Sequence, residues 1–524
     1  MTPGGLAMET EYAIPENSGD VLIVPPLEEI SGLLAEGWTR AWGDTAILDV
    51  PLAEFRRRVR ARALALAARY TGGAEPPPER PLILMGHQPL FFHPGVWFKF
   101  FLLTRLSAEC HATGLHLIVD TDASGPISAV LPAVRERMIR VSETLLDSPD
   151  DEPLEAARVP APEEWDRFLE RVRGHLATVP LRVLAERLDA FARGAEAARR
   201  GARTLAVFLA RLRRTYEARA GSPGYLELPV SALAETSEFR AFALHLLCHP
   251  QDLRRSYNAS LEEYRRAHRL RSAANPFPNL TEGGGSVETP FWVVRGGRRT
   301  DLFATRREHH LALGTAAETL ATVPADPSGL DALEAAGLAL RPKAMMLTMF
   351  ARLCLGDLFL HGVSGGRYDR VTDVIADRVF GCRLPAYVVA TATLHLPLAE
   401  EAQAAAARHA IEHRLMDLRH NPDRNMDALS DAQRRLVDEK WTLIRAIEGM
   451  RPGSDRRAAT RRIREVNAQL AEALAPEIAR LEARRAALER QGDAEDVARY
   501  RGYPFFLFDP AEVGALVGAP LRPA

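Results

Sequence analysis

The sequence predicts an α/β fold with a parallel sheet covered by helices, a long helical insertion, and a C-terminal antiparallel helical hairpin. Strand-like and helix-like segments alternate over residues 82–120 and again over 341–397, as they do in βαβ units. Residues 151–272 carry apolar side chains at helical spacing almost throughout. Residues 398–490 repeat apolar positions every three or four residues, which is the seam of a coiled coil.

The chain has 524 residues, which exceeds what one compact core usually holds and predicts several domains. The expected segments are a first half of the α/β core (1–150), a helical insertion (151–272), a hairpin with the second half of the core (273–397), a coiled-coil helical hairpin (398–490), and a tail that docks on the core (491–524).

Composition and charge are those of an ordinary globular protein. Hydrophobic residues make up 47% and charged residues 26%, and the net charge is −2, so nothing draws the whole molecule toward nucleic acid or anionic membranes. The N-terminus lacks the pattern of a signal peptide, and no apolar run of about 18 residues occurs. We therefore expect a cytoplasmic protein with neither a membrane nor a nucleic-acid partner.

The first βαβ unit is the clearest part of the α/β pattern. Leu82–Met85 has the character of a short buried strand, Val96–Ser107 that of a helix, and Leu115–Asp120 that of the next strand. An Arg-rich amphipathic helix is expected over 51–70, and a strand at 21–24. Strands joined by a helix in this way predict parallel pairing.

The loop GHQPLFFHPG of this unit holds the first candidate site, formed by Gly86, His87, Gln88, His93 and Gly95. Helix N-termini bind anions, and glycines before them let the backbone approach a phosphate. We expect His93 to donate to an anion and His87 to act as general acid or base, because histidine titrates near neutral pH. The alternative is a structural turn in which proline and glycine only set the geometry.

Two carboxylates, Asp120 and Asp122, follow the next strand in the run VDTDASGP. The carboxyl end of a strand is a usual place for carboxylates that bind ribose, a metal or an amine, and Asp122 is a second acid/base candidate. The alternative is a turn in which aspartate caps local N–H groups. Spacing alone leaves both interpretations open.

The run HGVSGGRYDRVTD holds the second candidate site, formed by His361, Gly365, Gly366, Arg367 and Asp369. Two glycines before a helix predict an anion nest, and an arginine offers a fork of donors for phosphate or carboxylate. The alternative is a glycine-rich surface turn. Because both candidate sites follow strands of one sheet, we expect them to face each other as a two-loop pocket.

Two further features concern the remaining chain. The strand-like runs 291–294 and 300–304 flank a Gly-Gly pair, which predicts a β-hairpin. The histidines elsewhere lack a third ligand at metal spacing, so no metal site is expected.

The first candidate site is similar to the His-x-Gly-His signature of nucleotidyltransferases and class I synthetases. His93, Pro94 and Gly95 match its first three positions, and Val96 stands at the fourth. The missing histidine argues against adenylyl transfer.

The order of the motifs, followed by a coiled coil, resembles the bacillithiol biosynthesis cysteine-adding ligase family. The run 86–88 stands at its Gly-Gln-Gln-like loop, IVDTDASG at its acidic run, and Arg341-Pro342 with HGVSGGRYD at its later motifs. The residues differ from the family pattern at His87, in the acidic run and at 364–366. These differences favour a divergent relative with another acceptor substrate.

The resemblance spans most of the chain in architecture. It implies a Rossmann-like core, a connecting helical domain, and a homodimer formed through the coiled coil at 398–490. It implies a ligase that joins an amino acid or other carboxylate to an amine-bearing small molecule, and a pocket for ATP or another adenine nucleotide.

Two other functions remain open on the sequence. In one, the protein is a non-enzymatic assembly factor whose working part is the hairpin at 398–490. In the other, the Arg-rich segments 55–62 and 456–465 bind RNA.

Overall fold

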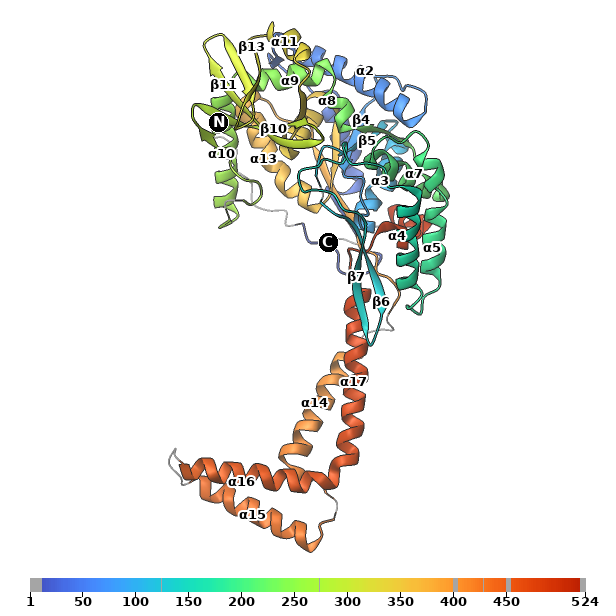
Figure 1. Ribbon diagram of the computed structural model, residues 1–524, viewed down its shortest axis with the longest axis vertical. Helices are drawn as coiled ribbons and strands as arrows, with labels where there is room; N and C mark the ends of the chain where they lie inside the picture. Colours follow the sequence, from blue (N-terminus) through green and yellow to red (C-terminus); the bar gives the residue numbers. More distant parts are fainter. Residues whose placement is uncertain are drawn as a thin grey trace.

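The computed structural model describes residues 12–123, 125–272, 274–398, 404–426, 428–448 and 454–518. A rounded body holds both large sheets, and a helical arm projects from it (Figure 1). The helices of the body are α1 (Leu27–Trp38), α2 (Leu52–Thr71), α3 (Pro94–Glu109), α4 (Pro162–Leu176), α5 (Val183–Ala192), α6 (Ala195–Arg199), α7 (Leu205–Glu217), α8 (Val230–Ala234), α9 (Ser237–Leu247), α10 (Pro250–Ala267), α11 (Gly329–Ala335), α12 (Ala344–Phe350), α13 (Val363–Phe380) and α18 (Pro510–Gly518).

The central sheet confirms the predicted α/β class. Five of its six strands are parallel, and β1 pairs with β16 in the antiparallel sense. In spatial order the strands are β1 (Val21–Val24), β16 (Tyr387–Ala392), β15 (Leu358–His361), β4 (Leu82–His87), β5 (Thr113–Ile118) and β8 (Tyr225–Pro229).

The strand order reverses between β4 and β15. The chain builds outward from β4 through β5 to β8, and it then returns to the other side of β4 to form β15 and β16. Trp97 and Phe98 of α3 pack in the hydrophobic core on one face of the sheet, whereas Val371 and Ile375 of α13 pack in the core on the other face. The helices that follow β4 and β15 thus cover opposite faces, and such a reversal is where open α/β sheets bind ligands.

The sequence predicts that residues 151–272 are almost wholly helical. In the structure, strand β8 lies among these helices and forms an edge of the central sheet. The sequence YLELP does not indicate a buried strand, because Glu227 interrupts the apolar run. Glu227 is nevertheless buried, because it forms ion pairs with Arg213 and His116. A long hairpin, β6 (Ile127–Val134) with β7 (Met138–Leu146), was also not predicted.

A second sheet is antiparallel and lies at the far side of the body from the arm (Figure 1). Where the sequence predicts a hairpin, β10 (Ser286–Arg295) and β11 (Arg298–Arg307) form one around Gly296 and Gly297, which both have positive φ. The other strands of this sheet are β9 (Glu282–Gly283), β12 (His310–Gly314), β13 (Thr319–Pro324) and β14 (Ala339–Pro342).

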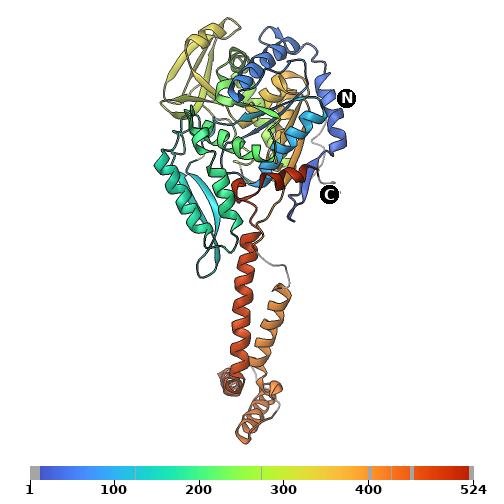
Figure 2. The same ribbon diagram turned by 90° about the vertical axis from the view of Figure 1, so that its right-hand side faces the viewer.

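The arm contains four helices where the sequence predicts a hairpin of two. They are α14 (Ala404–His420), α15 (Asp431–Glu448), α16 (Ser454–Ala471) and α17 (Ala475–Ala498). Helix α14 packs against α17, and α15 packs against α16. A 3₁₀ turn at Glu472–Leu474 interrupts the seam, so the outer pair of helices bends away from the inner pair (Figures 1 and 2).

The aromatic tail packs against the body next to α3. Phe505 and Phe506 are buried against Phe191, and α18 lies along α3. No helix in the described part of the chain combines the length and the apolarity that crossing a bilayer requires.

Candidate active site

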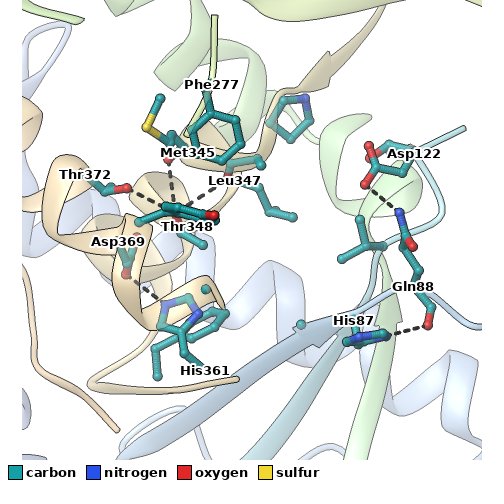
Figure 3. A pocket seen from close by; sticks show the side chains of 18 residues that line it. His87, Gln88, Asp122, Phe277, Met345, Leu347, Thr348, His361, Asp369 and Thr372 are labelled. Atoms are coloured by element: carbon teal, nitrogen blue, oxygen red, sulfur yellow. Dashed lines mark hydrogen bonds and ion pairs between the residues drawn. The ribbon is translucent and has the colours of Figure 1, made fainter. Parts of the chain in front are cut away.

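A cavity of about 350 Å³ lies at the carboxyl ends of β4 and β15, where the strand order reverses. Side chains from both predicted segments line it, from opposite sides (Figure 3). The predicted site residues that line it are Gly86, His87, Gln88, Asp122, His361, Gly365 and Asp369.

His87 ends β4 and is held as a neutral imidazole. Its Nδ1 lies 2.8 Å from the carbonyl oxygen of Gln88, and because a carbonyl only accepts, Nδ1 carries the proton and Nε2 keeps a lone pair. Burial, with a smaller contribution from the charge of Lys99, lowers the pKa of His87 to about 3. The imidazole therefore acts as an acceptor at neutral pH rather than as an acid.

Gln88 and Asp122 are linked to each other on the same side of the cavity. The Nε2 of Gln88 donates to Asp122 Oδ2 at 2.8 Å, and Arg299 of β11 donates to Asp122 Oδ1 at 2.9 Å. The second sheet thus fixes the carboxylate that follows β5. Asp122 is a positioned acceptor at the rim of the cavity.

His361 and Asp369 form a buried, hydrogen-bonded pair on the opposite side of the cavity. The Nε2 of His361 lies 2.8 Å from Asp369 Oδ2, and Arg352 donates to the same oxygen at 2.7 Å. Burial would raise the pKa of Asp369, but the charge of Arg352 and the hydrogen bond from His361 outweigh it and hold that pKa well below its usual range. Burial lowers the pKa of His361.

These protonation states decide what the pair can do. An ionised Asp369 only accepts, so Nε2 of His361 carries the ring proton and Nδ1 has the free lone pair. An imidazole oriented by a carboxylate in this way is a standard general base. The sequence predicts His87 for this role and His361 for binding, whereas the geometry favours His361.

The rest of the cavity wall is mainly apolar. Its side chains come from the loop before β9, from α12 and from β15. A wall of this kind can cover the apolar or aromatic part of a small molecule, while the few polar groups orient it. The residues are Phe277, Met345, Leu347 and Phe359.

His93 and Gly95 do not form the predicted anion site. His93 is the N-cap of α3, and its Nδ1 accepts the N–H of Gly95 at 3.1 Å. Burial, followed by the charges of Arg501 and Lys99, lowers the pKa of His93 to about 3. A Cβ on Gly95 would collide with the carbonyl oxygen of Ala392, so this glycine allows helix and strand to pack closely.

Asp120 also lies outside the cavity. Its carboxylate accepts the backbone N–H of Ser231 at 2.9 Å and the hydroxyl of the same residue. Burial raises its pKa to about 6. Asp120 therefore fixes the first turn of α8, a segment distant in the sequence, rather than capping local N–H groups or binding a ligand.

The sequence predicts a loop before a helix at Gly365, Gly366 and Arg367. In the structure, these residues lie in the first turns of α13 instead. A Cβ on Gly365 would lie 2.7 Å from Nδ1 of His361, so Gly365 makes room for that ring. Gly366 packs against Val389, and Arg367 donates to the carbonyl oxygen of Tyr12 at 2.9 Å. Neither Gly366 nor Arg367 reaches the cavity.

Lys99 of α3 is a residue that sequence reasoning missed. Its side chain is buried, with 3% of the residue exposed, and Nζ lies 3.6 Å from where a Cβ of Gly362 would be. Burial lowers the pKa of Lys99 to about 8. The sequence feature that could have identified it is a single lysine in the apolar run GVWFKFFLL. A lysine is rarely buried unless it is paired or has a function.

No family model and no curated protein sequence matches this chain. Within the described ranges, no three His, Cys, Asp or Glu side chains gather as metal ligands.

Proposed function

We propose that the protein is a ligase that joins the carboxyl carbon of an amino acid, or of another carboxylate, to the nitrogen of an amine-bearing small molecule. The observation that carries this proposal is the cavity at the strand reversal, where the His361–Asp369 pair stands opposite His87, Gln88 and Asp122. The order β8-β5-β4-β15-β16 supports a Rossmann-like core.

Each side chain has a role in this reaction. The carboxylate first attacks the γ-phosphorus of ATP, which releases ADP and leaves an acyl phosphate. The amine then enters as the free base, and Asp122 and Nε2 of His87 accept hydrogen bonds from its N–H groups and position it. As the carbon–nitrogen bond forms and inorganic phosphate departs, Nδ1 of His361 takes the proton that the nitrogen loses, and Asp369 stabilises the resulting imidazolium. The apolar wall formed by Phe277 and Met345 is where an adenine ring fits.

The test is product formation by the full-length protein. We incubate it with ATP and mixtures of amino acids and amino sugars, and mass spectrometry detects amides together with ADP. The His361→Ala variant should lose product, whereas Arg367→Ala, on the far side of α13, should keep it. Equal rates in wild type and His361→Ala would contradict the proposal.

We propose that the arm joins two copies of the chain in a homodimer through coiled-coil contacts. Two large apolar side chains of the arm are exposed, Met416 (63%) and Trp441 (38%), and such side chains on a projecting element favour a partner surface. In sedimentation, wild type should be a dimer and the Met416→Glu/Trp441→Glu variant a monomer. A monomeric wild type would contradict dimerisation.

The same arm is the observation that favours a non-enzymatic assembly protein as a second candidate function. In that case the cavity variants would bind partners normally, and no amide would form with any substrate mixture.

A further inference from the structure

We propose that the N-terminal turn of α13 and the ammonium of Lys99 form an anion-binding subsite at the edge of the cavity. The subsite would take an oxyanion, either a phosphate or a carboxylate. Its assignment to substrate binding rests on the proposed ligase function, whereas anion binding itself does not. Two observations support the subsite: the first turn of α13 has unsatisfied N–H groups, and the buried ammonium of Lys99 has no partner among the described residues.

The first observation is the helix end. Helix α13 has 18 residues, and its N-cap, Gly362, makes no side-chain cap hydrogen bond. The first backbone bond inside the helix runs from the N–H of Gly366 to the carbonyl of Gly362. Within the described part of the chain, the N–H groups of Val363, Ser364 and Gly365 are left without an acceptor, as the first turn of any helix leaves them. Such groups carry a partial positive charge and favour an anion.

The second observation is Lys99, which points at this helix end from the opposite face of the sheet. Only 3% of the residue is exposed, and its Nζ lies against Gly362. Among the residues that the structure describes, Nζ has no hydrogen-bond acceptor and no carboxylate partner. A buried lysine is expected to be paired.

The other buried cations of this molecule follow that expectation. Arg56 and Arg60 share Asp357, Arg213 pairs with Glu217 and Glu227, and Arg352 pairs with Asp369. Even the buried lysine of the arm, Lys440, has a partner, since its Nζ lies 2.6 Å from Asp423. Lys99 is therefore an exception among the buried cations of the described residues.

The groups around Lys99 explain why the missing partner is a ligand. The charge of Lys99 acts on His87, His93, His116 and His361, and burial is the main cause that lowers the pKa of each of these histidines. At neutral pH they carry no charge and cannot neutralise an ammonium. The nearby carboxylate of Asp369 is already paired with Arg352. An anion from solution would neutralise Lys99 and accept the helix N–H groups at the same time.

The position of the subsite links it to the cavity. Gly362 follows His361 directly, and both His361 and Gly365 line the cavity. A ligand whose body lies against the apolar wall can therefore place its phosphate or carboxylate at the start of α13. The sequence predicts an anion at both helix starts; the subsite lies at α13 and not at α3, and Lys99 supplies the cation that the sequence assigns to Arg367.

The experiment measures anion binding without turnover. Full-length wild type is titrated calorimetrically with inorganic phosphate, and separately with malonate, at pH 7. The variants are Lys99→Met, which removes the charge and keeps the length, and Lys440→Met, which removes the only comparably buried paired lysine. We expect phosphate or malonate to bind wild type and Lys440→Met equally, and Lys99→Met at least tenfold more weakly.

The two probes separate the sources of the oxyanion, because tighter phosphate binding indicates a nucleotide or phosphorylated substrate and tighter malonate binding indicates a carboxylate substrate. Equal binding by wild type and Lys99→Met, or no binding of either probe to wild type, would overturn the subsite. If Lys99→Met fails to fold, Lys99→Gln takes its place, with the same outcomes. A protein that binds phosphate at Lys99 but forms no amide would keep the subsite and lose the ligase proposal.

Discussion

Helices α3 and α13 follow neighbouring strands of one sheet, yet their N-termini differ. The N-terminus of α3 is capped by a side chain, because His93 accepts the N–H of Gly95. The carbonyl of Gly95 in turn accepts the hydroxyl of Thr391 at 3.3 Å. The end of α13 begins at a glycine with no capping side chain, and a buried ammonium faces it.

The difference shows what decides whether a helix end is available for a ligand. A residue that can reach back to the first N–H groups satisfies them within the protein, whereas glycine cannot. The motif His-Pro-Gly has the letters of a phosphate-binding turn, but its histidine is the cap. In the less familiar motif Gly362-Val363-Ser364, the N–H groups of the first turn find no acceptor among the described residues. Variants at corresponding positions of the two helices test this difference.

The largest effect is expected on turnover. His361→Ala removes the proposed base next to α13 and should lower the rate of amide formation by about 10²–10⁴-fold. His93→Ala, at the corresponding place before α3, should stay within about threefold of wild type, because capping adds nothing to the chemical step. Initial rates with ATP and the best substrate pair provide the measurement. Similar losses in both variants would show that the two ends are not functionally distinct.

The next effect is on stability. Asp369→Ala leaves the buried guanidinium of Arg352 with Asp373 as its carboxylate partner and the Pro385 carbonyl as an acceptor, and breaking a buried ion pair costs about 3–5 kcal/mol. Urea unfolding, followed by circular dichroism, measures the loss. Asp122→Ala, whose carboxylate is 42% exposed, is the control and should cost less than about 1 kcal/mol. A loss for Asp369→Ala as small as that of the control would contradict the buried network.

Lys99, in contrast to Asp369, should lower the stability of the folded protein while its side chain is charged. Its pKa in the folded protein is about 8, below the ordinary value of 10.5, so between these values the unfolded chain binds more protons and stability rises with pH. The full cost of the buried charge is present below about pH 8. In anion-free buffer, the free energy of unfolding of wild type should rise from pH 8 to 10.5 by about 3 kcal/mol more than that of Lys99→Met. Parallel curves for the two proteins would show that Lys99 finds a partner in the absence of ligand.

The smallest effect is that of the cap on α3. His93→Ala should lower the free energy of unfolding by about 1 kcal/mol, because the N–H of Gly95 loses its acceptor. His93→Asn keeps an acceptor at the same place and should recover most of this loss. A urea midpoint unchanged in His93→Ala would mean that the cap contributes nothing to stability.

The fold was predictable where local periodicity and tertiary structure agree. Residues 82–120 have strong apolar runs broken by turn residues, and they fold as β4, α3 and β5. Strand β8 was missed because its burial of Glu227 depends on Arg213 and His116, which no local pattern reveals. The arm was missed in part because the turn at Glu472–Leu474 falls inside an unbroken apolar repeat.

Some of the predicted site residues line the cavity and others do not, because residues that are neighbours in the sequence of a helix face different sides of it. Once 363–380 is known to be helical, Gly365, Asp369 and Thr372 fall on one face by their spacing, and all three line the cavity. Gly366 and Arg367 fall on another face and pack near Tyr12. Lys99 lies close to Gly362 only because α3 and α13 are brought to the same edge by the return of the chain to β15, which is a long-range event.

The most direct test of the central contrast is the position of a bound anion in a crystal of the full-length protein. Crystals soaked in selenate would show the ion by its anomalous scattering. We expect one peak within hydrogen-bond distance of the N–H groups of Val363–Gly365 and of Nζ of Lys99. A peak beside His93 at the start of α3, with none at α13, would contradict it.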